Sequence, residues 1–95
     1  MNARIINAPG PDVMHMLGRR IHPDMRATVK EQTFGAVGLV QASVADLYFF
    51  ADVAQKAADV LVVELFGSCP QHVTTLAFFG ETSAVRTAMQ AIERA

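Results

Sequence analysis

The sequence predicts an α+β fold, an α/β sandwich in which helices flank a small antiparallel sheet. β-prone segments and helical apolar stripes follow one another in the order β-β-α-β-α-β-β-α. The run Val60–Leu65 is apolar almost throughout, which is typical of a strand covered on both faces. Because the chain has 95 residues, we expect these elements to form one domain over residues 1–95.

Four elements are expected in the first part of the chain. Arg4–Asn7 is β-prone, and the proline- and glycine-rich run 8–12 ends it. Val13–Ile21 is interpreted as a second strand, since its side chains can alternate between two faces. A short helix is expected over 23–32, because a proline lies in its first turn. Ala36–Gln41 is expected to be the next strand.

The second part of the chain is predicted to begin with a long helix over Ser43–Ala58. Val60–Leu65 is then expected to form a strand, and the run 66–71 a loop. Val73–Phe79 is expected to pair with Val60–Leu65 as a hairpin. A turn at 80–83 begins the last helix. The core face of that helix is expected to consist of Val85, Ala88, Met89 and Ile92.

The predicted helix 43–58 is apolar on two sides. One stripe consists of Val44, Leu47, Ala51, Ala54 and Ala58, and a second consists of Phe49, Phe50, Val53 and Ala57. We expect both sides to be buried, and in a chain this short the second side is expected to meet another subunit. Ser43 and Asp46 have the capping-box spacing, which favours a helix start at this point.

The composition also indicates an oligomer. Apolar residues make up 52% of the chain and its mean hydropathy is +0.27, so we expect a partner surface beyond a small core. The net charge is −1, from 8 basic and 9 acidic residues, which favours neither nucleic acid nor an anionic membrane as a partner. The single Cys69 excludes an intrachain disulfide and favours a cytoplasmic location. No apolar run is long enough to cross a bilayer.

No constellation of catalytic or metal-binding residues is evident. His15, His22 and His72 lack the spacing of metal ligands, and Cys69 has no recognisable base with an orienting group. There is no glycine-rich phosphate loop. We therefore expect that the protein is not an enzyme and binds no cofactor or metal. His22 is expected to fix a strand-to-helix turn. Core positions are expected for Met14, Met16, Met25 and Met89.

Several blocks of the sequence resemble bacterial microcompartment shell proteins. The strand Ala36–Val40 and the helix-to-strand run Ala51–Val60 resemble the core of that family's domain, the BMC domain. Gly80–Ala88 resembles its turn into the second helix, and Arg20–Asp24 resembles its Arg-Pro-His segment. Arg4–Ile6, followed by a Pro-Gly pair, resembles the N-terminal arm of shell proteins from ethanolamine and propanediol compartments.

The order of these blocks implies a circular permutation. In the common shell domain the Arg-Pro-His segment follows the second helix, whereas here Arg20–Asp24 precedes the first core strand. This order is similar to the permuted hexameric subtype of the ethanolamine- and propanediol-utilisation compartments. Residues 1–11 would then be an N-terminal β arm.

The resemblance implies a structural protein of the bacterial microcompartment shell, located in the cytoplasm. It implies cyclic homohexamers that tile with other shell proteins around enclosed enzymes and pass small metabolites through a central pore. Lys56 and Arg20 are the implied hexamer–hexamer edge residues, with Arg19 as a competitor for the second role. The alternative for Lys56 is a solvated side chain at the C-terminal end of its helix.

The same resemblance implies two further functional segments. The pore loop is expected to comprise Gly67, Ser68, Cys69, Pro70 and Gln71. The axial arm, part of a small β-barrel over the pore, is expected to comprise Arg4, Ile5 and Ile6. The Cys-Pro pair of the loop replaces the glycine-rich turn of common hexamers.

A second function class is a small oligomeric α/β regulatory or metabolite-sensing module, because small α+β domains host many functions. A phosphate-binding loop or a cluster of basic residues in the sequence would favour it, and neither is evident. The shell protein is therefore the leading hypothesis.

Overall fold

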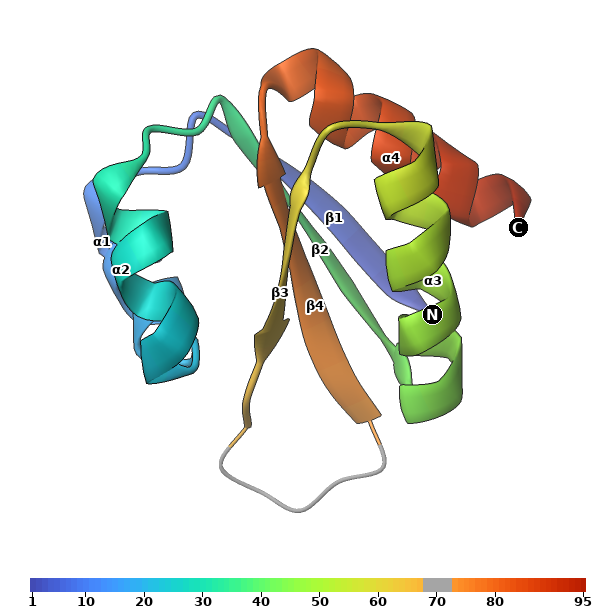
Figure 1. Ribbon diagram of the computed structural model, residues 1–95, viewed down its shortest axis with the longest axis horizontal. Helices are drawn as coiled ribbons and strands as arrows, with labels where there is room; N and C mark the ends of the chain where they lie inside the picture. The colour runs from blue at the N-terminus through green and yellow to red at the C-terminus, as the bar shows by residue number, and fades with distance from the viewer. Residues whose placement is uncertain (68–72) are drawn as a thin grey trace.

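The computed structural model describes residues 1–67 and 73–95, and its central layer is a four-stranded antiparallel sheet. In chain order the elements are β1 (Asn2–Asn7), α1 (Pro11–Gly18), α2 (Pro23–Glu31), β2 (Ala36–Ser43), α3 (Val44–Ala57), β3 (Leu61–Leu65), β4 (Val73–Gly80) and α4 (Thr82–Arg94). The strand order is β1-β2-β4-β3. Helices α1 and α2 lie on one side of the sheet and α3 and α4 on the other (Figure 1). The predicted α+β class is confirmed.

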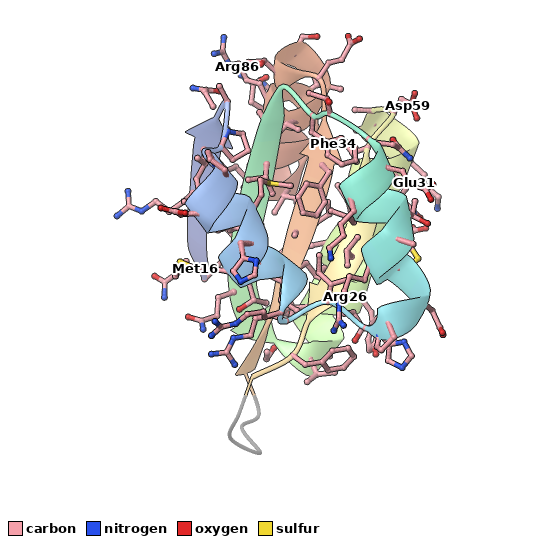
Figure 2. The ribbon with its side chains drawn as sticks, turned by 90° about the vertical axis from the view of Figure 1, so that its left-hand side faces the viewer. Met16, Arg26, Glu31, Phe34, Asp59 and Arg86 are labelled. Carbon is pink, nitrogen blue, oxygen red and sulfur yellow. The ribbon has the colours of Figure 1, made fainter. Side chains whose placement is uncertain are left out.

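The segment predicted to be the second strand is helical. Instead of a strand over Val13–Ile21, the chain forms α1, and Pro11 suits the first helical position. Met14 and Leu17 pack against the core, whereas Met16 is 62% exposed and lies on the outside of the molecule (Figure 2). A spacing of three between inward positions fits a helical period and not the alternation of a strand. The core position expected for Met16 is therefore also wrong.

The N-terminal segment belongs to the sheet. β1 runs antiparallel to β2 along its whole length, and Ile6 packs against the core on the α1–α2 side. The backbone N–H of Ala8 then donates to the carbonyl oxygen of Gly35 at 2.8 Å, which ties the end of β1 to the start of β2. Within the single chain, β1 is therefore an outer strand of the sheet.

Two apolar clusters fill the spaces on the two sides of the sheet. Val40 and Phe78 belong to the cluster beneath α3 and α4, whereas Val37 and Phe79 belong to the cluster beneath α1 and α2. This alternation follows from the two-residue period of a strand. The hairpin of β3 with β4 is confirmed, and so is the predicted core face of α4, which is buried at Val85, Ala88, Met89 and Ile92.

Helix α3 begins directly after Ser43, as predicted, but the capping differs from a capping box. The Ser43 hydroxyl makes no bond to a backbone N–H and instead donates to Asp46 Oδ2 at 3.0 Å. The helix buries Leu47 and Ala54 against the sheet. Packing of this apolar stripe therefore stabilises α3 more than its cap does.

Candidate functional site

Lys56 lies in the last turn of α3, with its side chain 77% exposed. Its Nζ is 2.7 Å from Oδ2 of Asp52, one helical turn earlier. An exposed pair at this spacing contributes only about 0.3–0.5 kcal/mol. The ammonium group is thus held loosely at the surface, where a second molecule can reach it.

Arg20 joins the chain to the segment that follows β3. Its Nη1 donates to the carbonyl oxygen of Phe66 at 3.3 Å, and the Phe66 backbone N–H donates to the Arg20 carbonyl oxygen at 2.9 Å. Ile21 forms an antiparallel bridge with Leu65, and the rings of His22 and Phe66 meet edge to face at 6.2 Å. We call this group of five residues the Phe66 clamp.

The structure does not bring Lys56 and Arg20 together within one chain. Lys56 lies just before β3, whereas Arg20 contacts Phe66 just after β3. Five residues of strand separate these ends by roughly 16 Å. Of the two competing arginines, Arg20 makes the contact with Phe66, while Arg19 is exposed at the end of α1.

His22 has the structural role predicted for it. It is the N-cap residue of α2, and its Nδ1 accepts a hydrogen bond from the backbone N–H of Asp24 at 3.2 Å. Oδ2 of Asp24 is also 3.3 Å from Nδ1. A nitrogen that accepts from a backbone N–H carries no proton, so this cap and an ion pair with Asp24 exclude each other.

The expected pore loop is described only at its start. Gly67 is exposed and directly follows the Phe66 clamp. The other loop residues, Ser68, Cys69, Pro70 and Gln71, lie outside the described residues, as does His72. The clamp therefore fixes the point from which the loop leaves the sheet.

The outer face of α3 carries aromatic side chains that the single chain does not cover. Tyr48 is 60% exposed and Phe49 is 55% exposed, whereas Phe50 and Val53 pack against the core. The second apolar face predicted for this helix is therefore divided between the core and the surface. Tyr48 was missed because its ring belongs to neither apolar stripe.

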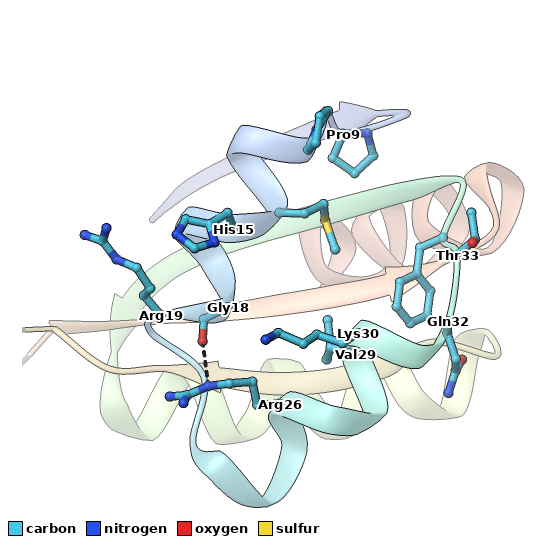
Figure 3. Close-up of a pocket in the computed structure, with 12 residues that line it drawn as sticks. Pro9, His15, Gly18, Arg19, Arg26, Val29, Lys30, Gln32 and Thr33 are labelled. Carbon is cyan, nitrogen blue, oxygen red and sulfur yellow. Dashed lines mark hydrogen bonds between the residues drawn. The ribbon is translucent and has the colours of Figure 1, made fainter.

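A cavity of about 750 Å³ between α1 and α2 was also missed (Figure 3). Its walls depend on residues 11–18 being helical, so the interpretation of Val13–Ile21 as a strand hid it. The spacing of Met14 and Leu17 was the signal that would have revealed a helix there.

Residues 1–67 and 73–95 contain neither a candidate metal site nor a candidate membrane-spanning helix. No group of three or more potential metal ligands occurs in this part of the chain. Nor does any helix within it have the length and apolarity needed to span a bilayer.

Solved structures similar to this chain are microcompartment shell proteins. The ligand-free GrpU shell protein from Pectobacterium wasabiae is 43% identical, with a TM-score of 0.77 over 97% of this chain and 99% of that one. The GrpU shell protein from Clostridiales bacterium 1_7_47FAA is 30% identical, with a TM-score of 0.71 over 98% of this chain and 88% of that one. No curated protein matches the chain.

A third structure shares the fold. The fused permuted hexameric shell protein from the RMM microcompartment has a TM-score of 0.71 at 24% identity, over 98% of this chain and 43% of that one. The fold and these relatives define a structural shell protein of a microcompartment, not an enzyme. The chain belongs to the BMC domain family, which its sequence matches over residues 36–95.

Proposed function

We propose that this shell protein forms cyclic homohexamers through the outer face of α3. The observation that carries the proposal is the exposure of Tyr48 and Phe49 on that face. Full burial of one such side chain contributes about 1.5–3 kcal/mol, and aromatic side chains are frequent binding hot spots. A contact of this face with a different surface of the next copy generates a ring when the rotation closes.

The domain is circularly permuted in this proposal. The BMC domain match begins at the first residue of β2, so β1, α1 and α2 precede the matched region. Arg20–Asp24 lies in this preceding part but contacts the end of β3 through the Phe66 clamp. This placement supports a permutation in which Arg20–Asp24 is the Arg-Pro-His segment.

Six copies of the loop Gly67–Gln71 line a central pore that passes small metabolites. Support comes from the Phe66 clamp, which holds the start of the loop at one end of the sheet in every copy. Rings then meet at their edges through Lys56. Arg20 joins that contact only from a different subunit, because it lies at the other end of β3.

The neighbours in this assembly are other shell proteins, and the assembled shell surrounds enzymes in the cytoplasm. The family of the chain and the GrpU shell-protein relatives support this setting. An axial barrel of Arg4, Ile5 and Ile6 requires the outer edge of β1, because its inner edge is paired with β2.

Native mass spectrometry tests the ring. We expect a mass six times that of the 10.3 kDa chain. Phe49→Ser should shift the population toward smaller species, because it removes an exposed aromatic side chain from α3. Met16→Ser is the matched control, since Met16 is exposed to a similar extent but lies on α1, and it should leave the hexamer intact.

The result for the unaltered protein decides between the function classes. A monomer at micromolar concentration would overturn the proposal. A trimer that binds a nucleotide tightly in equilibrium dialysis would favour the regulatory module instead.

A further inference from the structure

The cavity between α1 and α2 combines an apolar floor with cationic walls. Met14, Val29 and Phe34 line its apolar part. Val29 is 4% exposed, and the ring of Phe34 lies 5.0 Å from that of Phe79, so this floor continues into the core. Its volume of about 750 Å³ lies within the range of small-molecule sites.

Three of the chain's eight basic residues line this cavity, together with His15. They are Arg19, Arg26 and Lys30, and no acidic residue is among the lining residues. None of the three forms an ion pair within residues 1–67 and 73–95. A chain with a net charge of −1 thus concentrates unpaired positive charge at one concave site.

Arg26 is fixed at the cavity with donors to spare. Its Nε donates to the carbonyl oxygen of Gly18 at 3.1 Å (Figure 3), and its Nη2 donates to the carbonyl oxygen of Ile21, also at 3.1 Å. A guanidinium has five N–H donors, so three remain for another acceptor. The half-buried Arg26 is therefore a preorganised cation, because the protein already holds its orientation.

Lys30 supplies a second positive charge near Arg26, on an exposed side chain. Its side chain extends from α2 toward the Gly18 end of the cavity, whereas Arg19 extends away from the cavity at the end of α1 (Figure 3). Both side chains are exposed. Lys30 can therefore contact an anion beside Arg26, while Arg19 adds longer-range attraction.

We propose that this cavity binds a small organic anion, a carboxylate or phosphate that carries a short apolar chain. The anionic group lies between Lys30 and Arg26, and the apolar chain lies on Met14, Val29 and Phe34. The inference goes beyond the shell function, since it concerns a site within each subunit and not the contacts between subunits.

Saturation-transfer NMR on the assembled protein tests the site with three probes of equal chain length. We expect hexanoate to bind at least about tenfold more tightly than 1-hexanol, because only the carboxylate pairs with the cations. Hexylammonium should not bind. Equal binding of the three probes, or no hexanoate binding at millimolar concentration, would overturn the proposal.

The variant Lys30→Gln tests whether the anionic group of the probe contacts Lys30. It should weaken hexanoate binding about twofold to fivefold, as expected for one charged contact at an exposed side chain. Lys30→Arg should retain binding, because the charge remains. Arg86→Gln is the control, since it removes one exposed positive charge from α4 on the other side of the sheet (Figure 2).

Light scattering measures the oligomer mass and so tests whether binding at this cavity is independent of assembly. Lys30→Gln should leave the oligomer mass unchanged while hexanoate affinity falls. Hexanoate affinity that is unchanged in Lys30→Gln, or reduced to the same extent in Arg86→Gln, would show that the bound anion does not occupy this cavity.

Discussion

Gly38 is the residue at which one added methyl group has the clearest structural cost. A Cβ atom at this position of β2 would lie 2.7 Å from Met89 Sδ and 3.3 Å from Val85 Cγ1. Both neighbours are on α4, so the glycine allows α4 to approach the sheet closely. A glycine inside a strand indicates that another element approaches closely, but the residues that oppose Gly38 depend on packing between distant segments.

We expect Gly38→Ala to lower the free energy of unfolding by about 1–3 kcal/mol, because the extra atom overpacks the core beneath α4. Urea denaturation of the two proteins measures the difference. Gly18→Ala is the control, since apart from its own helical turn no atom lies within 4 Å of a Cβ built there, and a helical alanine should be neutral or stabilising. Equal midpoints for Gly38→Ala and the unaltered protein would show that α4 moves away without cost.

At the level of elements, β1 is an integral outer strand of the sheet. It pairs with β2 along its length, contacts α4, and places Ile6 in the cluster on the α1–α2 side. The sequence predicted that Arg4–Asn7 is a strand but not which strand it joins. Strand partners are set by contacts between residues far apart in the chain, which local patterns do not encode.

Deleting residues 1–8 should lower the free energy of unfolding by more than about 2 kcal/mol, because Ile6 loses its burial and β2 loses its partner. Thermal unfolding followed by circular dichroism measures this loss. Arg4→Gln retains the strand and should unfold at nearly the original temperature. A deletion variant of unchanged stability would mean that β1 is a detachable arm.

The elements differ in how clearly the sequence encodes them. The core face of α4 and the long helix were predictable from apolar stripes with a helical period, and the first strand of the hairpin was predictable from its continuous apolar run. The error at Val13–Ile21 arose because so short a segment fits a period of two as well as a period of 3.6. The cavity followed that error, since it exists only between two helices.

At the level of the whole molecule, a variant of Lys56 tests the contacts between rings without altering the formation of each ring. We expect Lys56→Ala to leave the hexamer intact in native mass spectrometry but to impair two-dimensional sheets in electron microscopy. The reason is that its exposed ammonium group makes only a weak pair with Asp52 within the chain.

Asp52→Ala is the matched variant, because it breaks the same ion pair and leaves Lys56 free. Sheets that form normally in Asp52→Ala but not in Lys56→Ala would assign the contact to the lysine itself. Sheets that form normally in both variants would show that Lys56 is only a surface residue of its own helix.

The Phe66 clamp has a further consequence for how molecules of this protein avoid associating in the wrong way. β3 is an outer strand of the sheet, and open strand edges recruit strands from other chains into fibrous aggregates. The bridge from Ile21 to Leu65 and the bond from Phe66 to Arg20 cover the final part of that edge. On this side of the sheet, the open edge of β3 is therefore limited to the short stretch before Leu65, which restricts pairing with a strand of another chain.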